Sequence, residues 1–563
     1  MSFLMRSIRQ HPKTWFYSCW LLINLIQSAG TQLLDDEAYY WVYSRFPDWG
    51  YFDHPPMIAV LIKAGFAIFK NELGVRLFMA VMNAATLWLV QHMLLAKNDR
   101  LFYAIALSMG VLQIGGILAV PDIPLTFFTA LFFFQYRRFL DKSDLGQSLL
   151  LGVVMALMLY SKYHGILIIL LTLFSNPKLA LRWQAWLAAM TGIILFAPHL
   201  WWQYTHDFPS VQYHLRERNA PAYRFSFTLE YILGQILLAG PLIGWMLLYA
   251  AGRFRTSDVF ARALKYSMTG FYLFFLVSTL KGRVEANWTV PALVPLMILA
   301  HAWLSQSFTH ARWVYRLMPP ALIAVVLLRG YMITDIPQLT GRFKDEMHNN
   351  KVWAASIKKA SGGLPVVFFN SYQRPSKYWF YTGDTSFALN TTTYRRSNYN
   401  FWPMESEMQG RRVFVVDDQM GNYSSSTLIE TRKRPTYGKV FDNYRSYSGV
   451  QIKPNPDKLE IRQGRLAVFS ADIHPAPFAS HFGFNAAPEN QTLEITLDIF
   501  KGKSLEKRIP VIATLSSGNS LVFSAKDTIQ LPPGEYRAKL GISTSLPGIF
   551  SQNTAALPLQ ISK

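Results

Sequence analysis

The stretch LLDDEAYYWVYSRFPDWGYFDHPPM, residues 33–57, decides how the rest of this chain is interpreted. It follows an apolar run of about 20 residues, which is long enough to cross a bilayer as a helix. Yet the stretch carries the consecutive acids Asp35, Asp36 and Glu37, together with His54 and many aromatic residues. Ionisable side chains beside an apolar span normally face a protein-lined or watery cavity, because lipid does not solvate them. The stretch therefore predicts a polar site at the mouth of the first membrane span.

The composition is typical of a polytopic α-helical membrane protein. Of the 563 residues, 51% are hydrophobic and only 16% are charged, a balance too apolar for a soluble chain of this length. Apolar runs of about 18 or more residues are typical of membrane helices, and the sequence predicts about eleven spans. The expected spans cover residues 14–34, 75–96, 101–119, 122–139, 147–160, 163–176, 183–203, 229–250, 264–280, 286–305 and 316–335.

The net charge of +21 would suggest nucleic acid as the partner of a soluble protein. Here the basic residues fit the cytoplasmic loops of a membrane protein, so no nucleic-acid partner is expected. With a cytoplasmic N-terminus, every alternate turn carries Lys or Arg, and an odd number of spans places residues 336–563 on the opposite side. The first apolar run is interpreted as an uncleaved signal anchor, with cleavage after Gly30 as the alternative. The single cysteine, Cys19, excludes a disulfide framework.

Five polar segments then fall on the non-cytoplasmic face. They are LLDDEAYYW…YFDHPPM, AVPDIPL, YSKYHG, THDFPS…HLRERNAP and KGRVEANW. Each segment alone can be a solvated loop, but five on one face predict a single site there. The apolar runs that flank SKYHG have about 14 residues each, so a broken or tilted helix pair is expected. The run MIAVLIKAGFAIFK, residues 57–70, has helical apolar spacing and is expected to lie in the membrane surface.

Asp36 and Glu37 are the candidate catalytic residues. Adjacent carboxylates at a membrane edge can supply a general base, a metal site or an ion path. On a helix they diverge by about 100°, so one can face a substrate while a partner holds the other. The alternative for Asp35 is to cap the helix that follows. Asp36, Glu37 and Asp122 are also the candidate ligands of a divalent cation, although no spacing demands one, and no other cofactor is expected.

The candidates for substrate binding lie at other apolar borders. Asp122 stands between two prolines where a span re-enters the membrane, and capping that helix is its alternative role. Lys162, with Tyr163 and His164 beside it, interrupts an apolar region, and a cavity-facing lysine is a natural partner for a phosphate. Snorkelling to the membrane surface is the alternative for such a lysine.

A second polar group contains Lys281, Arg283 and Glu285, and snorkelling suits Lys281 better than Lys162. His54 precedes two prolines, where it either contacts a substrate or shapes the turn. The sequence contains no HExxH, no Cys/His cluster and no Gly-rich nucleotide loop. A soluble nucleotide sugar or ATP therefore has no evident binding motif in this chain.

Several of these motifs, in this order, resemble one family. DEAYYWVYSRFPDWGYFDHPPMIAVLIK, ELGVRL, PDIPLTFF…YRRFL, SKYHGILI and KGRVEANWTVPAL are similar to the bacterial branch of the protein O-mannosyltransferase and lipid A aminoarabinose transferase superfamily. These are membrane glycosyltransferases of the GT-C type, and the likeness covers roughly residues 1–335. The segment SYQRPSKYWFY…RRSNYNFW, residues 371–402, also resembles the region after the last spans in such proteins.

The resemblance implies a multi-pass enzyme of the bacterial inner membrane whose donor is a sugar on a polyprenyl (undecaprenyl) phosphate. It assigns the catalytic base to Asp36, with Asp35 as the competing assignment, and matches Glu37 to the acid that follows the base. It also matches Asp122 to an acid of the second loop, and Lys162 and Lys281 to positions beside the lipid phosphate. The sequence has DEAYYW where the aminoarabinose enzymes usually have Arg and Tyr after the acid pair. This departure argues against aminoarabinose and against lipid A phosphate as acceptor.

The expected reaction is inverting glycosyl transfer on the periplasmic face. Asp36 would take the proton of an acceptor hydroxyl, and Lys162 with Lys281 or Arg283 would stabilise the leaving phosphate. The acceptor stays open among lipid A, another glycan and a protein. A flippase or transporter of a lipid-linked sugar is the alternative function, and a receptor anchored by its spans is a second one. The sequence shows no clear internal repeat of the kind that transporters often have.

The sequence predicts three regions. Residues 1–335 form the membrane domain, and residues 336–452 contain short β-rich runs and a helical segment that predict a small periplasmic α/β domain. Residues 453–563 contain alternating strands that predict a periplasmic β-sandwich of Ig-like type. Nothing in the last two regions looks catalytic, so acceptor recruitment or docking to the spans is their expected role.

Overall fold

The computed structural model describes residues 7, 10–213, 223–336, 345–474, 493–517 and 520–563. The predicted polar segment HLRERNAP lies outside these described residues. The chain divides into two compact units. The first unit contains Met1–Asp207 and Ala220–His348, and the second contains Phe208–Asn219 and Asn349–Lys563.

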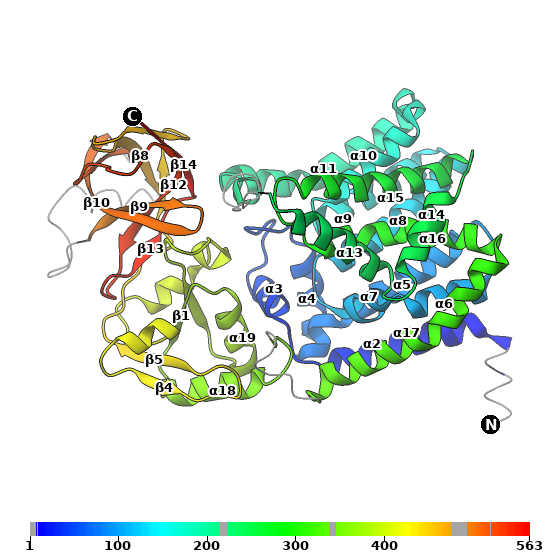
Figure 1. The fold of residues 1–563 in the computed structure, drawn as a ribbon, viewed down its shortest axis with the longest axis horizontal. Helices are drawn as coiled ribbons and strands as arrows, with labels where there is room; N and C mark the ends of the chain where they lie inside the picture. Colours follow the sequence, from blue (N-terminus) through cyan, green and yellow to red (C-terminus); the bar gives the residue numbers. More distant parts are fainter. Residues whose placement is uncertain (1–6, 8–9, 214–222, 337–344, 475–492, 518–519) are drawn as a thin grey trace. The chain divides into compact units, whose positions relative to one another are not determined.

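The first unit is helical, and its helices pack side by side around an apolar core (Figure 1). Its elements are α2 (Pro12–Gly30), α3 (Asp35–Arg45), α4 (Met57–Ile68), α5 (Glu72–His92), α6 (Asp99–Ser108), α7 (Gly110–Ile114), η1 (Gly115–Ile117), α8 (Asp122–Asp141), α9 (Leu145–Ser161), α10 (Gly165–Ser175), η2 (Pro177–Leu181), α11 (Trp183–Thr205), α13 (Phe225–Ala239), α14 (Gly244–Arg253), α15 (Val259–Ser278), η4 (Ala286–Ala292), α16 (Leu293–Ser305) and α17 (Phe308–Thr334).

Each expected span falls on a helix or on a pair of consecutive helices. By length and apolar composition, four helical segments among the described residues can cross a membrane: α5, α11, η4 with α16, and α17. Two pairs also qualify, α6 with α7 and η1, bent by 75°, and α13 with α14, bent by 91°, which raises the number to as many as six. The chain is a multi-pass membrane protein, while the count of eleven spans stays a prediction.

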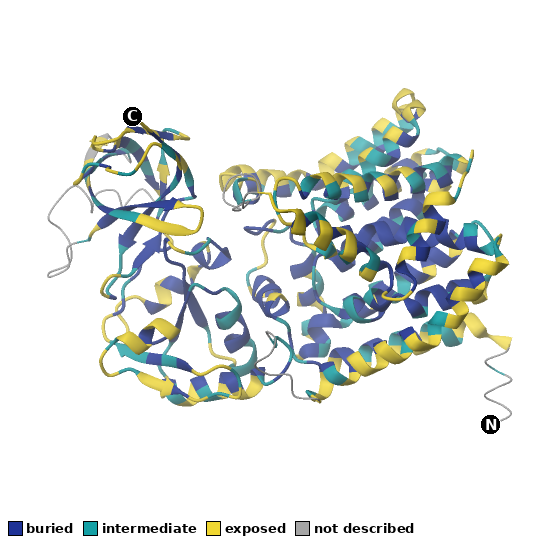
Figure 2. Ribbon diagram, in the orientation of Figure 1, coloured by how far each residue is buried: buried dark blue, intermediate teal, exposed yellow. Residues whose placement is uncertain are grey.

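The helices differ in how much apolar surface they expose. Figure 2 shows exposed residues along α11 and α17, where Ile193, Ile194, Ile323 and Leu327 are exposed apolar side chains. Helix α16 is instead buried along nearly its whole length. An apolar side chain at the outside of a helix bundle is favourable in contact with lipid and costly in water. The outer faces of α11 and α17 are therefore suited to contact with lipid tails.

The expected break around SKYHG is present and positions a charged side chain. Helix α9 ends at Ser161, Lys162 has an extended backbone, and α10 begins at Gly165. The backbone amide of Lys162 still donates to the Met158 carbonyl, 3.1 Å away. Because the helix stops at this residue, the Lys162 side chain leaves the direction that the next helical turn would have given it. It is buried, with 5% of its surface exposed.

The second unit contains a mixed sheet of five strands in the order β2-β1-β3-β5-β4. Strand β1 runs parallel to β2 and β3, whereas β5 is antiparallel to β3 and β4. The strands are β1 (Val366–Phe369), β2 (Ser386–Leu389), β3 (Val413–Val416), β4 (Thr427–Ile429) and β5 (Thr436–Phe441), and the helices are α12 (Pro209–Gln212), α18 (Asn350–Ser361) and α19 (Gln373–Thr382). Buried aromatic and branched side chains of β1 and α18 share one core, as the short β-rich runs predict.

The remaining strands of the second unit form one sheet of nine strands. Eight strands follow the order β6-β8-β11-β10-β9-β12-β14-β7, and β13 pairs with β12. They are β6 (Gln451–Pro454), β7 (Leu459–Arg462), β8 (Val468–His474), β9 (Ile495–Lys501), β10 (Ser504–Ser517), β11 (Ser520–Ala525), β12 (Gly534–Ser543), β13 (Phe550–Gln552) and β14 (Leu557–Ser562). Buried residues of these strands share one core, and the Ig-like sandwich stays a prediction.

Candidate functional site

The acidic cluster of the opening stretch forms the start of α3. Leu34 is the N-cap, and Asp35 is the first helical residue, so the prediction of Asp35 as the N-cap is wrong by one position. The third helical residue, Glu37, accepts the backbone N–H of Leu34 at 2.9 Å. This is the side chain that satisfies the cap, because a glutamate at this position can reach back to the first amide of the turn.

Glu37 also forms a fully buried ion pair with Arg76 of α5. Arg76 Nε donates to Glu37 Oε1 at 2.7 Å, and its Nη2 donates to Oε2. The same guanidinium donates to the carbonyl oxygens of Ser28, Thr31 and Gln32 at the end of α2. A guanidinium can use its five donors in this way, and a buried pair is stable only when the remaining donors are satisfied. The pair therefore fixes α3 to α5 and to the end of α2.

Asp36 and Glu37 face opposite environments. Glu37 has no exposed surface, whereas Asp36 is exposed at the first turn of α3. The rotation of about 100° between neighbouring helical residues explains this difference. The expectation that a partner holds one acid while the other can meet a substrate is consistent with this geometry.

A third contact connects the start of α3 to the start of α8. The backbone N–H of Ala119 donates to Glu37 Oε1 at 2.8 Å. Asp122, the first residue of α8, follows Ala119 by only three positions. Glu37 therefore holds the loop that leads into α8, and the acids of the first and second predicted loops belong to one region of the fold.

Asp122 lies at the centre of a buried polar group. Lys162 Nζ donates to Asp122 Oδ1 at 2.7 Å, and the Asn287 amide donates to Oδ2 at 3.1 Å. Both members of the ion pair are buried, with side-chain exposures of 6% for Lys162 and 5% for Asp122. The N-terminus of a helix also favours a negative charge. The structure thus brings together three of the five predicted polar segments at one carboxylate.

Tyr163 lies in a hydrogen-bonded chain with α11. His199 Nδ1 is 2.7 Å from the Trp49 carbonyl oxygen, so this nitrogen carries the proton and Nε2 is the acceptor. Tyr163 Oη then donates to His199 Nε2 at 2.9 Å and accepts from the Gln203 amide at 2.9 Å. The chain joins the segment after α9 to α11 and to the loop after α3.

The two predicted histidines have aromatic neighbours. The His164 ring lies 5.2 Å from the ring of Phe275 and 5.5 Å from that of Trp288. The His54 ring lies 5.5 Å from the Tyr40 ring, edge to face. His54 thus packs within the loop after α3, whereas His164 packs between α15 and η4.

The second predicted polar group lies at the surface of the first unit. Lys281 is exposed. Arg283 Nε lies 3.5 Å from Glu230 and 3.9 Å from Glu285, with 61% of the Arg283 side chain exposed. Exposed pairs of this kind contribute about 0–1 kcal/mol, so they do not fix the segment. Asn287 is the member of this segment that reaches Asp122.

A buried tyrosine of α3, Tyr43, contacts a buried aspartate of the loop that follows the helix. Tyr43 Oη donates to Asp53 Oδ1, and the Tyr43 ring stacks on Tyr51 with centroids 4.0 Å apart. Burial and the nearby charge of Asp53 raise the pKa of Tyr43 well above its usual value. Tyr43 therefore remains a donor at physiological pH, and it holds the loop against α3.

The chain is similar to several known proteins. A family model described as dolichyl-phosphate-mannose-protein mannosyltransferase matches residues 53–202. A curated relative, the lipid A galacturonosyltransferase RgtD of Rhizobium johnstonii, is 26% identical over 312 residues, 51% of this chain and 63% of the relative. The match thus spans less than two thirds of that relative's length.

Two solved structures share the fold. The apo structure of ArnT from Cupriavidus metallidurans has a TM-score of 0.57 at 13% identity, covering 77% of this chain and 98% of ArnT. ArnT bound to undecaprenyl phosphate has a TM-score of 0.55 at 13% identity, covering 76% of this chain and 97% of ArnT. The chain thus resembles the PMT/ArnT-like GT-C superfamily in the sequence of residues 53–202 and in its fold.

Two residues of this GT-C site were not singled out from the sequence. Arg76 lies within ELGVRL, in an otherwise apolar helix, and a lone buried arginine in a span is a signal for a charged partner. That signal could have identified Arg76, although not its partner. Asn287 carries no such signal, because an uncharged amide at a span border is ordinary.

Two of the three carboxylates considered for a cation contact positive groups. Glu37 pairs with Arg76, and Asp122 pairs with Lys162. Among the described residues, the three His, Asp or Glu side chains whose donor atoms lie within 4.8 Å of one another are Asp335, Asp345 and His348. That group lies after α17, outside the predicted set.

Proposed function

We propose that the chain is an inverting glycosyltransferase. It moves a sugar from a polyprenyl phosphate to a glycolipid at the periplasmic face of the inner membrane. The observation that carries the proposal is that a GT-C fold holds an exposed carboxylate, Asp36, and a buried cation, Lys162, on segments that are linked by hydrogen bonds. The hydrogen bond from the Ala119 N–H to Glu37 connects the segment of Asp36 to the loop before Asp122, and Asp122 binds Lys162.

Asp36 is the proposed base. The acceptor hydroxyl oxygen attacks the anomeric carbon, and the bond from that carbon to the phosphate oxygen breaks. The hydroxyl proton passes to the Asp36 carboxylate. Configuration inverts at the carbon because the hydroxyl attacks from the face opposite the leaving phosphate. Glu37 does not exchange protons in this mechanism: it is a positioning residue, because Arg76 and two backbone amides hold its oxygens.

Lys162 is the proposed partner of the leaving group. Polyprenyl phosphate gains negative charge as the bond breaks, and a preorganised cation in a poorly solvated place stabilises that charge most. An ammonium has three donors, of which Asp122 accepts one, so the phosphate can bind the same nitrogen. Asp122 and Asn287 position Lys162 and keep its charge in place.

The comparisons support the choice of donor and acceptor. ArnT was solved with undecaprenyl phosphate, and RgtD carries lipid A and galacturonic acid in its name. We therefore propose undecaprenyl phosphate as the lipid of the donor and a lipid A-type glycolipid as acceptor. A lipid donor also explains why the fold exposes apolar faces, since the polyprenyl tail can stay in the bilayer.

The test is a transfer assay with the purified protein in detergent. Lipid A and undecaprenyl phosphate sugars, including the galacturonic acid and mannose forms, are the substrates, and mass spectrometry detects the product. We expect Asp36→Asn to lower the rate by at least about 100-fold, as loss of a general base does. Its thermal unfolding should be unchanged, because Asp36 is exposed.

Asp35→Asn is the matched control, since it makes the same change one residue away. If Asp36→Asn kept full transfer activity and Asp35→Asn lost it, the base would be Asp35 and not Asp36. Movement of labelled lipid between leaflets without any glycosylated product would support the flippase instead.

A further inference from the structure

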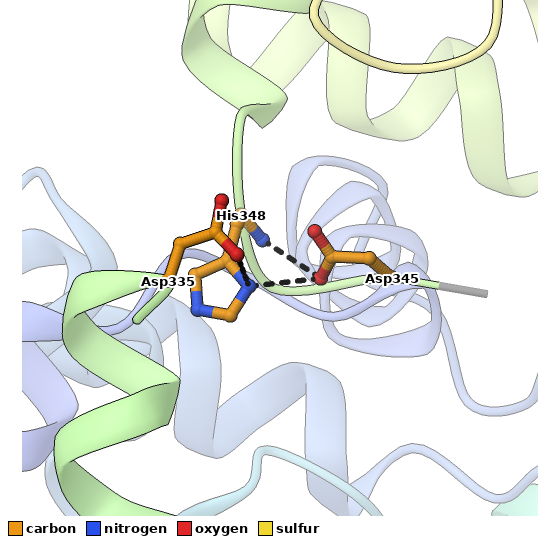
Figure 3. A group of neighbouring side chains, drawn as sticks. All are labelled: Asp335, Asp345 and His348. Carbon is orange, nitrogen blue, oxygen red and sulfur yellow. Dashed lines mark hydrogen bonds and ion pairs between the residues drawn. The ribbon is translucent and has the colours of Figure 1, made fainter. Parts of the chain in front are cut away.

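Three side chains that follow α17 converge in the first unit, apart from the proposed catalytic groups. Asp335 comes directly after the helix, and Asp345 and His348 return to the same place, as Figure 3 shows. One donor atom from each residue lies within 4.8 Å of the other two. The side chain of His348 is only 5% exposed, and those of Asp335 and Asp345 are 16% and 9% exposed.

The imidazole of His348 is oriented from outside this group. Its Nε2 lies 2.7 Å from the Tyr331 carbonyl oxygen, and the two rings pack edge to face at 4.9 Å. A carbonyl oxygen has no proton to give, so Nε2 must carry one. The Nδ1 atom then points at Asp345 Oδ1, 3.0 Å away, and lies 3.7 Å from Asp335 Oδ1.

The second ring nitrogen, Nδ1, faces two carboxylate oxygens where the three side chains are largely buried. A histidine that donates one N–H to a backbone carbonyl and directs the other nitrogen towards carboxylates is the usual arrangement of a metal-ligating histidine. The orientation of the His348 ring therefore indicates a metal site independently of the two nearby carboxylates.

We propose that Asp335, Asp345 and His348 bind a divalent transition-metal ion, with Zn²⁺ as the best fit. Zn²⁺ takes one nitrogen and two carboxylate oxygens readily, whereas Mg²⁺ and Ca²⁺ prefer oxygen ligands alone. Bringing the ligand atoms to bonding distance needs small side-chain rotations. A fourth ligand, such as water, would complete the tetrahedron.

The site has a structural link to α3. Glu346 lies between two of the ligands in sequence, and its Oε2 accepts the backbone N–H of Asp35 at 3.4 Å. A metal that fixes Asp345 and His348 would also hold Glu346 beside the first turn of α3. Because the next residue is Asp36, the metal would position the proposed base without touching the substrate. This last step rests on the proposed function, whereas the binding of the metal does not.

The test measures metal binding directly. The full-length protein, purified in detergent without a polyhistidine tag, is stripped with EDTA and titrated with Zn²⁺, Mn²⁺ or Mg²⁺, with bound metal read by elemental analysis. We expect about one Zn²⁺ per chain and a higher unfolding temperature, because a ligand of the folded state stabilises it. Mg²⁺ should have little effect.

Two variants test the ligands. Asp345→Asn keeps an oxygen that can accept the backbone N–H groups of Met347 and His348, so this turn should still form. We expect it, and Asp335→Asn, to weaken Zn²⁺ binding at least roughly tenfold. The matched control is His310→Ala, at the other end of α17, where the ring is exposed.

Zn²⁺ binding that is equal in both Asn variants and the control would overturn the proposal. So would a wild-type protein that binds no Zn²⁺. Normal Zn²⁺ binding with no sugar transfer would overturn only the proposed function.

Discussion

At the scale of single residues, the candidate site consists of charges in pairs with different exposures. Glu37 and Arg76 are fully buried, and every interaction described for them holds helices together. Lys162 and Asp122 are almost as buried, but they lie where a helix ends and another begins. Asp36, next to Glu37 in sequence, is exposed. Burial therefore separates Glu37 from Asp36, whereas Lys162 differs from Arg76 in its place at a helix break.

Arg76→Met should be strongly destabilising. It leaves the Glu37 carboxylate buried without its cation, and removing one member of a buried pair costs about 3–5 kcal/mol. The double variant Glu37→Gln with Arg76→Met should be clearly more stable than Arg76→Met alone, because no charge is left buried. Thermal unfolding in detergent measures both. An Arg76→Met variant as stable as the wild type would contradict the structural role of this pair.

Lys162→Met should slow sugar transfer by about 100-fold or more, through loss of the charge that stabilises the leaving phosphate. Methionine preserves most of the packing but leaves the Asp122 carboxylate buried without its cation, so the rate is measured at a temperature where thermal unfolding shows that the variant is folded. Lys70→Met, which changes an exposed lysine at the end of α4, is the matched control. Transfer kinetics with saturating acceptor distinguish the two variants. Equal rates for both would remove Lys162 from the mechanism.

At the scale of elements, close helix contacts and helix breaks position these residues. Helix α9 packs along α11 with a glycine at the contact: a Cβ added at Gly152 would lie 2.5 Å from the Ala188 carbonyl oxygen and 2.6 Å from Thr191 Cβ. This contact sets the direction of α9 and hence the place where it ends, at Ser161. The break after α9 then delivers Lys162 to Asp122.

Gly152→Ala should therefore destabilise the helix bundle by about 1–3 kcal/mol, because the added methyl forces α9 and α11 apart. Gly252 is a matched control on α14, where an added Cβ meets nothing within 4 Å. Gly252→Ala should be neutral or slightly stabilising, since alanine favours a helix more than glycine does. Unfolding temperatures of the two variants give the comparison. A Gly152→Ala protein at least as stable as the Gly252→Ala protein would contradict the close packing.

At the scale of the whole molecule, the predicted orientation places the C-terminal unit in the periplasm. In a Cys19→Ser background, Asp384→Cys should react with a membrane-impermeant thiol reagent in spheroplasts. Ser143→Cys, in a turn expected in the cytoplasm, should react only after lysis. Both positions lie outside the candidate spans, and Cys19 is the only native cysteine. The reverse pattern of labelling would invert the topology and place Asp36 in the cytosol.

Much of this fold could be predicted from the sequence because its signals are local. Apolar runs fall on helices, and the strands LPVVFFN and RRVFVVDD fall on β1 and β3. The break at Lys162 was also predicted, since runs that are too short for a span are visible in one dimension. The order of the last nine strands could not be predicted, because alternating polar and apolar residues do not indicate which strands pair.

The sequence by itself determined that the chain is apolar, that acids and cations collect at the ends of its spans, and that Asp36 and Glu37 diverge on a helix. Only the tertiary structure decided which acid is held and which is exposed. Arg76 and Ala119 come from separate segments to reach Glu37, as Lys162 and Asn287 do for Asp122. The physical reason is that a buried charge requires its partner within a few ångströms, and contacts at that distance depend on how distant parts of the chain pack.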